Sequence, residues 1–488
     1  MSSPIIYWFR QDLRTRDLPG LLAAAATGQP IVACYILDEV SATEHAPGSA
    51  SRWWLHHSLE ALAGEIAELG GSLVLRRGDA KKELDRLIEE TGAEAVYCSR
   101  LYEPWANTLE ETLHAALDAR GVSFRRYPGS LLFEPGKVMN LSGGPFKVFT
   151  PFWRHCRAAS APPRPKPQPA QITWFDSTVA TDTLPRWNLL PRDPDWAQHW
   201  PTLWQPGSAG AHKRLKLFLA GPVGDYSEGR NHPAKDATSR LSAHLHFGEI
   251  SPRVVWHAAR SLADRETHSE QQVDKFLSEL GWREFSHHLL YHFPHLVAEP
   301  FKPQFREFPW LGNETALRAW QRGQTGYPIV DAGMRELWHT GYMHNRIRMV
   351  VASFLTKHLL VHWRAGARWF WDTLVDADLA NNSCGWQWVA GSGADASPYF
   401  RIFNPVIQGE KFDARGVYLR KWVPELALLP DRYLNRPWEA PPEVLEQAGV
   451  RLGENYPRPL VDHKSARESA LAAYAAIRDS GEQDDVVA

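Results

Sequence analysis

The first 130 residues alternate short apolar runs with segments of helical periodicity, and this alternation restricts the fold more than any other feature of the sequence. The apolar runs predict strands at residues 5–9, 31–37, 72–75, 95–98 and 122–127. The segments between them predict helices at residues 18–26, 52–68, 81–90 and 105–120. Strands that alternate with helices form parallel sheets with helical crossovers. We therefore expect an α/β domain over residues 1–130, built on a doubly wound five-stranded parallel sheet.

The rest of the chain has a different pattern. Residues 207–480 show mostly 3.6-residue periodicity, and helices are expected at residues 211–220, 273–291, 314–321, 331–339, 344–360, 365–374 and 464–477. Residues 131–206 include a proline-rich stretch at 161–169, which is typical of a stiff spacer. We expect an interdomain linker over 131–206, an all-α domain over 207–480 and a frayed polar tail over 481–488.

Composition excludes several classes of protein. Hydrophobic residues make up 44% of the chain and charged residues 23%, as in a soluble globular protein. No apolar run is long enough for a membrane span, and the start Met1-Ser2-Ser3-Pro4 does not resemble a secretory signal. Four scattered cysteines give no disulfide framework. We expect a cytoplasmic monomer with no membrane contact.

Two sequence motifs could indicate a metal or a dinucleotide, but we interpret both as parts of the structure without a ligand. His56-His57 and His287-His288 are adjacent pairs, and neighbours on a helix point in different directions, so no metal site is expected. Residues 391–396 match GxGxxA, but no clear βαβ unit follows them, and no GxGxxG follows the first strand. We expect a turn at 391–396 and no dinucleotide domain of the usual kind.

Charge and tryptophan are unevenly distributed. Residues 1–130 carry 13 Lys and Arg against 18 Asp and Glu, whereas residues 301–370 carry 10 against 4. The chain contains 22 tryptophans. A basic segment is what a phosphate backbone requires, although a solvated surface explains it equally well. A surplus of indoles is explained by packing in the core, by stacking on bases or on a planar cofactor, or by electron transfer.

Three short segments carry polar side chains in patterns that suggest a bound ligand. Residues 238–242 place three hydroxyls and a guanidinium ahead of a helical segment, which suits a phosphate group. Asn345 and Met349 lie four residues apart and share a helix face, with Arg346 and Arg348 beside it. Residues 376–382 combine two carboxylates with an amide, which suits the polar edge of a heteroaromatic ring.

Together these segments resemble the photolyase/cryptochrome family. WFRQDLR at residues 8–14 matches the family's WFRxDLR signature, and further matches follow in order at 225–226, 238–242, 282–285, 326–331, 343–349, 385–388 and 398–405. The resemblance runs from residue 4 to about residue 475. Residues 51–55 and 370–374 are similar to those of the bacterial photolyases that stand nearest to plant cryptochromes.

The resemblance implies a helical domain that holds FAD. It assigns the diphosphate and ribityl region to Tyr226, Thr238, Ser239, Arg240, Leu241 and Ser242. It pairs Arg348 with Asp376 over the flavin and also assigns Ala377 to the cofactor site. Asp378 would accept from the ring N3–H, and Asn382 would face flavin N5. Trp386, Trp363 and Trp310 match the family's electron relay from the surface.

The resemblance also implies light-driven repair of cyclobutane pyrimidine dimers, through electron transfer from reduced FAD to a dimer flipped out of single- or double-stranded DNA. Glu279, Arg283 and Asn345 would contact the flipped bases, Met349 would give an apolar contact, and Trp282 and Trp388 would stack on them. Arg230, Arg346 and Gln408 would contact DNA. Relatives that repair the 6-4 photoproduct carry His at the positions of Asn345 and Met349.

Several alternatives stay open at this stage. The antenna implied by the resemblance is 5,10-methenyltetrahydrofolate with Glu103 beside the pterin, and the alternatives are an 8-hydroxy-deazaflavin or no antenna. The main functional alternative is a blue-light cryptochrome receptor. Plant cryptochromes tend to carry Asp, Tyr and Val where this chain has Asn382, Trp388 and Met349. A flavin electron-transfer protein without DNA is a further alternative, but it would need neither the basic segment nor Trp388.

Overall fold

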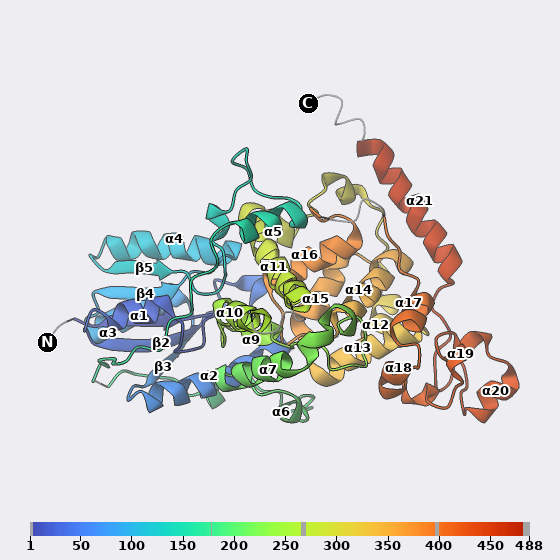
Figure 1. Cartoon of the computed structure of the whole chain (residues 1–488), viewed down its shortest axis with the longest axis horizontal. Coiled ribbons are helices and arrows are strands. Elements are labelled where there is room, and N and C mark those ends of the chain that lie inside the picture. Colours follow the sequence, from blue (N-terminus) through green and yellow to red (C-terminus); the bar gives the residue numbers. More distant parts are fainter. Residues whose placement is uncertain (1–2, 177, 265–269, 396–399, 482–488) are drawn as a thin grey trace. The chain divides into compact units, whose positions relative to one another are not determined.

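The structure, a computed structural model, describes residues 3–176, 178–264, 270–395 and 400–481 (Figure 1). The chain divides into two compact units. Unit 1 comprises residues 1–224, 239–294 and 375–380, and unit 2 comprises residues 225–238, 295–374 and 381–488. This division differs from the predicted domains, because helices at 208–220 and 242–292 group with the sheet in unit 1. The predicted tail at 482–488 lies outside the described residues.

The predicted five-stranded parallel sheet is confirmed. Its strands are β1 (Ile5–Phe9), β2 (Ile31–Leu37), β3 (Leu73–Arg77), β4 (Ala95–Ser99) and β5 (Ser123–Tyr127), in the order β3-β2-β1-β4-β5. Every neighbouring pair is parallel. The crossover helices are α1 (Pro19–Ala25), α2 (Ser49–Glu68), α3 (Ala80–Thr91) and α4 (Pro104–Asp118). The predicted ends differ from these by at most a few residues, as expected where helices fray.

Central strand β1 is buried along its whole length, whereas edge strand β5 is mostly exposed. This explains why β1 is a continuous apolar run and β5 carries Arg125 and Arg126. Cys34 and Cys98 lie in the apolar cluster formed with α3 and α4, as small core residues. The four cysteines are free thiols.

Strand order reverses between β1 and β4, the point at which open α/β sheets usually bind ligands. Here side chains of the protein occupy it. Arg10 follows β1 and pairs with the fully buried Glu110 at 2.6 Å, and it also donates to the carbonyl of Ser99. Arg126 of β5 reaches the second oxygen of Glu110 at 3.0 Å. Two guanidinium groups therefore satisfy one buried carboxylate.

The remaining helices of unit 1 are α5 (Phe149–Ala158), α6 (Trp200–Leu203), α7 (Ser208–Ala220), α9 (Ser242–His246), α10 (Pro252–Ala263) and α11 (Glu270–His292). Helix α5 lies in the predicted linker and packs on α11, where the rings of Phe149 and Trp282 stack at 3.8 Å. The stretch at 161–169 has no helix or strand, as expected for a proline-rich spacer.

Unit 2 is helical, as predicted. It contains α8 (Tyr226–Gly229), α12 (Glu314–Gln321), α13 (Pro328–Thr340), α14 (Asn345–Ser353), α15 (Trp363–Thr373), α17 (Pro405–Phe412), α18 (Val417–Trp422), α19 (Asp431–Leu434), α20 (Pro442–Gln447) and α21 (His463–Gly481). Helix α16 (Leu379–Ala390) begins in the last residues of unit 1. No helix among the described ranges combines the length and apolar character that a membrane crossing requires.

The single helix expected over 344–360 is wrong in its second half. Helix α14 ends at Ser353, and residues 354–358 form a π-helical turn. Leu360 then adopts a left-handed conformation with φ of 51°, which stops the helix. The expected turn at 391–396 is present over 391–395, and Ala396 lies outside the described residues.

His56 and His57 of α2 both lie near the carboxylate of Glu60. His56 Nε2 lies 3.3 Å from one carboxylate oxygen of Glu60, and His57 Nδ1 lies 3.0 Å from the other. Adjacent helical residues do diverge, but Glu60 lies four residues after the first and three after the second, so it is near both.

Candidate cofactor and nucleic-acid site

The segment 238–242 has the backbone of an anion-binding loop. Arg240 is left-handed with φ of 50°, and Leu241 is right-handed with φ of −88°. A pair of opposite hand directs successive N–H groups to the same side, where they can bind a phosphate. Ser239 Oγ accepts from the Leu241 N–H at 3.4 Å. A left-handed arginine is uncommon, and a phosphate-binding role gives a reason for it.

Asp378 is the centre of a buried polar cluster in unit 1. One of its carboxylate oxygens lies 3.4 Å from His246 Nδ1 and 3.5 Å from His287 Nε2. Burial alone would raise the pKa of Asp378, but the two imidazoles and Arg283 lower it well below its usual range. The carboxylate is therefore ionised at neutral pH and can accept hydrogen bonds. Sequence reasoning missed His246 and considered His287 only as one of an adjacent pair, since only the fold brings both histidines to this aspartate.

Glu103 belongs to the same cluster. It is buried, interacts electrostatically with Asp378 and His246, and accepts from Gln11 Nε2 at 3.3 Å. Burial and the nearby Asp378 raise the pKa of Glu103. Asp376 and Ala377, predicted beside the flavin, are also buried in unit 1.

Other predicted cofactor residues lie in unit 2. Arg348 Nε donates to the carbonyl of Met343 at 2.7 Å, and its guanidinium lies over the Tyr342 ring. Asn382 Nδ2 donates to the carbonyl of Ala367 at 3.0 Å, which fixes the orientation of its amide. The predicted pairing of Arg348 with Asp376 stays a prediction.

A cationic cluster surrounds the predicted substrate face of α14. Asn345 is exposed and Met349 is half-buried. Arg346 donates to Asn231 Oδ1 at 2.6 Å, reaches Met349 Sδ at 3.9 Å and lies over the Phe412 ring. Burial, Arg230 and Arg401 together lower the pKa of Arg346.

The partners of Arg346 within the described ranges include no carboxylate. Arg230, the other predicted DNA contact in this cluster, lies over the ring of Tyr226. The positive charge of Arg346 is therefore not compensated by an acid, which suits a phosphate group.

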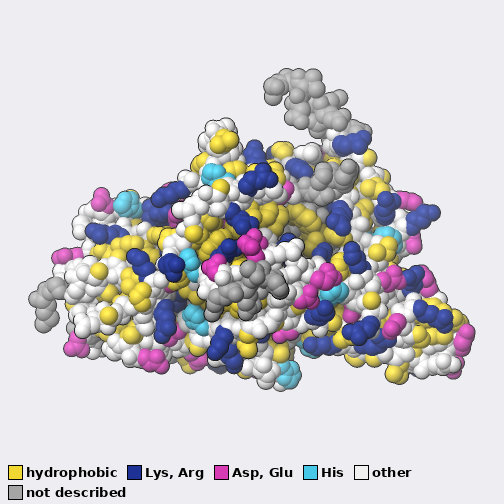
Figure 2. Space-filling model, viewed as in Figure 1, with side chains coloured by type: hydrophobic (Ala, Val, Ile, Leu, Met, Phe, Trp, Pro, Cys, Tyr) yellow, Lys and Arg dark blue, Asp and Glu magenta, His cyan; other side chains and the backbone are white. Residues whose placement is uncertain are grey.

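Basic side chains are also numerous elsewhere on unit 2. Figure 2 shows Lys and Arg over the region of α12, α13 and α18. These helices carry Arg318, Arg335, Arg420 and Lys421, and Arg322 is the C-cap of α12. Two further predicted DNA residues, Gln408 of α17 and Trp388 of α16, are each partly exposed.

The predicted base contacts in unit 1 all lie on α11. Trp282 stacks on Phe149 at 9° between ring planes, so one face of its indole is already covered. Arg283 donates to the carbonyl of Ser130 at 2.8 Å and lies 3.3 Å from Glu284. Glu279 lies 3.6 Å from Lys275 Nζ. Arg283 is thus bound to unit 1 itself.

The three predicted relay tryptophans range from the interior of unit 2 to its surface. Trp386 and Trp363 are buried, and Trp310 is partly exposed. A Cβ at Gly366 would lie 2.1 Å from the Trp386 ring, so only glycine allows this packing. His362 contacts both Trp310, at 5.0 Å between ring centroids, and Trp363, at 5.6 Å. Sequence reasoning missed His362.

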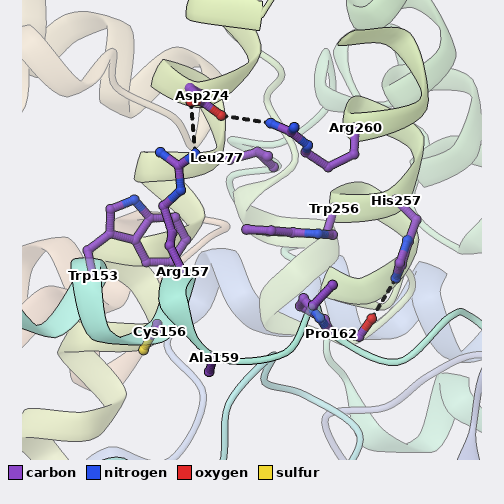
Figure 3. A pocket seen from close by; sticks show the side chains of 11 residues that line it. Trp153, Cys156, Arg157, Ala159, Pro162, Trp256, His257, Arg260, Asp274 and Leu277 are labelled. Atoms are coloured by element: carbon purple, nitrogen blue, oxygen red, sulfur yellow. Dashed lines mark hydrogen bonds and ion pairs between the residues drawn. The ribbon is translucent and has the colours of Figure 1, made fainter. Parts of the chain in front are cut away.

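A cavity of about 420 Å³ opens in unit 1 among α5, α10 and α11 (Figure 3). Trp153 and Trp256 line it, with ring centroids 5.9 Å apart. Asp274 accepts from Arg157 at 3.0 Å and from Arg260 at 2.8 Å, so the cavity has one positive charge in excess. The volume and the aromatic walls suit a planar organic ligand.

Comparison with known proteins identifies the family. The model of the FAD binding domain of DNA photolyase matches residues 276–476, and the DNA photolyase model matches residues 5–170. A protein named deoxyribodipyrimidine photo-lyase from Agrobacterium fabrum is 49% identical, with 98% of each chain covered. Cryptochrome-1 of Arabidopsis thaliana is 38% identical over 98% of this chain and 72% of its own length.

The crystal structure of a bacterial class III photolyase from Agrobacterium tumefaciens superposes with a TM-score of 0.95, at 49% identity and 98% coverage of each chain. The chain belongs to the photolyase/cryptochrome family, and its FAD-binding domain is that of the DNA photolyases.

Glu284, another residue that sequence reasoning missed, connects α11 to the segment after β5. Its Oε2 accepts from the backbone N–H groups of Leu132, at 2.8 Å, and Phe133, at 3.1 Å. Burial raises the pKa of Glu284 from 4.5 to about 7, even though Arg283 opposes this. The carboxyl therefore holds its proton more tightly in the folded state than in the unfolded chain.

This linkage predicts the pH dependence of stability. The contribution of Glu284 is complete below about pH 4.5 and is lost as pH rises to about 7. Glu284→Gln removes the titration, so the decrease in Tm between about pH 5 and about pH 7.5 should shrink by on the order of 2 °C. Calorimetry at a series of pH values measures this. Glu270→Gln, an exposed change on the same helix, is the control. An unchanged pH profile in Glu284→Gln would contradict the assignment.

Proposed function

We propose that the protein is a deoxyribodipyrimidine photo-lyase, a carbon–carbon lyase that uses light to split cyclobutane pyrimidine dimers in DNA. The observation that carries the proposal is the near full-length similarity to a protein of that name. The guanidinium of Arg346, beside Asn345 and Met349, supports it, because its partners among the described residues include no carboxylate and DNA binding requires positive charge. FAD, when bound in its reduced form and excited by light, supplies the electron that cleaves the dimer.

The residues of the chain fit the cofactor that the family model implies. We assign the diphosphate to the loop Thr238, Ser239, Arg240, Leu241 and Ser242, on the strength of its opposite-handed backbone pair, and keep the assignment of Tyr226 that the resemblance implies. We assign Asp378 to the ring edge, because its carboxylate is buried, ionised and held by two imidazoles. Asn382 has a fixed amide and is assigned to flavin N5.

The chain also has groups suited to a flipped dimer. Arg230 and Arg346 would contact backbone phosphates, together with Gln408. Flipping a damaged step costs a few kcal/mol. Stacking on Trp388 and on the free face of Trp282 would recover about 1–3 kcal/mol per base. Glu279 and Asn345 provide hydrogen-bonding groups, and Met349 provides an apolar contact.

The side chains of α14 favour the cyclobutane dimer over the 6-4 photoproduct. Repair of the 6-4 lesion requires proton transfer between bases, for which an imidazole is suited near neutral pH. Asn345 cannot titrate near neutral pH, and Met349 has no exchangeable proton. Cleavage of a cyclobutane dimer needs no such acid, so an amide donor and an apolar thioether are sufficient there.

A repair assay tests both the activity and the lesion. The purified protein, chemically reduced and illuminated, should restore thymines in oligonucleotides that carry cyclobutane dimers and should leave 6-4 products intact. The same mixtures kept in darkness are the control. Arg346→Gln should weaken binding to damaged and undamaged DNA alike and lower the salt dependence by about one phosphate contact. Efficient 6-4 repair without dimer repair would overturn the proposal.

A blue-light receptor is the second candidate, and the similarity to Cryptochrome-1 is the specific observation in its favour. Repair activity discriminates between the two, since signalling requires no lesion. The resemblance assigns Asp, Tyr and Val to plant cryptochromes at three positions where this chain has Asn382, Trp388 and Met349. We therefore place repair first.

We further propose that Trp386, Trp363 and Trp310 relay electrons from an external reductant. The burial of Trp386 and Trp363 and the partial exposure of Trp310 support this route. Trp386→Phe keeps most of the bulk but removes the easily oxidised indole, so photoreduction followed by flavin absorbance should fall at least about tenfold, while repair by chemically reduced enzyme persists. Trp187→Phe, a buried indole of unit 1, is the control. Unchanged photoreduction in Trp386→Phe would exclude this route.

For the antenna we propose 5,10-methenyltetrahydrofolate, with two candidate locations. The resemblance indicates Glu103, which is buried beside Asp378. The structure offers the cavity lined by Trp153 and Trp256, whose indoles suit a pterin ring and whose excess positive charge suits glutamyl carboxylates. Of the two locations we favour the cavity, because it has empty space for a ligand.

Loss of the antenna in defined variants separates these locations. Trp256→Leu should release the folate and keep FAD, whereas Glu103→Gln should keep both, as measured by mass spectrometry of the extracted chromophores. The retained FAD reports that each variant is folded. Folate loss in Glu103→Gln alone would assign the antenna to Glu103. Extraction of a deazaflavin, or of no second chromophore, would overturn the folate proposal.

We also propose that the protein is a cytoplasmic monomer. Four free thiols, three of them buried, fit a reducing compartment. Light scattering of the purified protein tests the monomer.

A further inference from the structure

The three side chains His56, His57 and Glu60 of α2 form a group that the proposed function does not use. Their ligand atoms, one from each residue, all lie within 4.8 Å of one another. Within the described ranges this is the one group of three or more His, Cys, Asp or Glu residues that converge in this way. All three project from a single helix, so their relative positions are set by the backbone of α2.

Two of the three spacings in this group are close to those of a metal coordination shell. Ligands about 2.0–2.1 Å from a tetrahedral Zn²⁺ are separated by about 3.3–3.4 Å. His56 Nε2 and Glu60 Oε1 are 3.3 Å apart, and His57 Nδ1 and Glu60 Oε2 are 3.0 Å apart. Rotations of the two imidazoles and of the Glu60 side chain, from positions already within 4.8 Å of one another, would complete a three-ligand site.

The exposed fraction of the side chain increases from His56 to His57 to Glu60, which suits a metal site that is open on one side. The His56 side chain is 9% exposed, that of His57 29% and that of Glu60 53%. The exposed side lets the ion enter and keep a water molecule as its fourth ligand.

Hydrogen bonding alone explains part of this geometry, since one carboxylate can accept from two imidazoles. It leaves His56 Nδ1 buried and without a partner among the described residues. Metal binding at Nε2 would move the His56 proton to Nδ1 and leave that nitrogen equally unpaired. The unpaired nitrogen is therefore common to hydrogen bonding and to metal binding. Only metal binding predicts the uptake of one equivalent of metal, which can be measured.

We propose that His56, His57 and Glu60 form a binding site for one divalent transition-metal ion, with Zn²⁺ as the ion that its imidazole and carboxylate ligands favour. Two imidazoles and a carboxylate with an open position are a ligand set used by zinc in other proteins. Mg²⁺ and Ca²⁺ prefer oxygen ligands and would bind weakly here. Bound Zn²⁺ would tie together two turns of α2 and stabilise unit 1 by mass action.

The test is a titration of the FAD-loaded full chain with ZnCl₂ after removal of metals by a chelating resin. The wild type should bind one equivalent more tightly than any other. Glu60→Gln and His57→Phe should each weaken that equivalent at least about tenfold, because loss of even an outer-shell group costs about 10–100-fold. His57→Phe keeps a ring against Trp53, with which His57 is in contact.

A second His–Glu pair provides the matched control. His232 and Glu228 have the same four-residue spacing as His56 and Glu60 and lie 2.9 Å apart, but no third ligand among the described residues is grouped with them. His232→Ala should leave the tight equivalent unchanged. Flavin absorbance and circular dichroism verify folding in each variant.

X-ray absorption of the one-zinc complex gives an independent measurement. Nitrogen and oxygen neighbours at about 2.0–2.1 Å without sulfur support the site. Sulfur neighbours at about 2.3 Å would place the ion on cysteine and overturn the proposal. The absence of a tight equivalent in the wild type, or its persistence in both Glu60→Gln and His57→Phe, would overturn it as well.

Discussion

The ionised carboxylate of Asp378 is the group on which the buried polar cluster of unit 1 depends. A carboxylate in an apolar interior is costly unless it is paired and hydrogen-bonded, and His246 and His287 supply the pairing. The same charge bears on Glu103, whose pKa it raises, and on Arg283, which it attracts. Arg283 in turn donates to the carbonyl of Ser130. One buried charge thereby couples residues from four separate parts of the sequence.

Prediction from the sequence succeeded where a local pattern determines the result and was incomplete where distant segments meet. Strands β1 and β2 are continuous apolar runs, and their bounds were predicted correctly. The π-helical turn after Ser353 was missed, because its apolar residues keep a helical pattern through the change. His246, His362 and Glu284 have no distinctive local sequence, so only the fold reveals their contacts. The cavity beside Trp153 and Trp256 also depends on α5, which lies far in sequence from the neighbouring helices α10 and α11.

Two observations of different origin support the proposed repair activity. Similarity over nearly the whole chain gives the family and its flavin. The contacts of Arg346 give a physical reason for DNA, since a half-buried guanidinium that has no acidic partner in the described part of the chain is costly unless a phosphate approaches it. Neither observation alone distinguishes repair from light sensing. The non-titrating pair Asn345 and Met349 adds the chemical argument for a dimer that needs only an electron.

The contact of His362 with Trp310 and Trp363 has a consequence for how the proposed relay responds to acidity. Burial, with help from Arg364 and Arg368, lowers the pKa of His362 to about 4. The imidazole is therefore uncharged throughout the pH range of a living cell. An imidazolium at this position would oppose the positive charge left on an oxidised indole and make each neighbouring tryptophan a poorer donor. A neutral ring has no such effect, so the rate at which the relay supplies electrons to the flavin should not change with cellular pH.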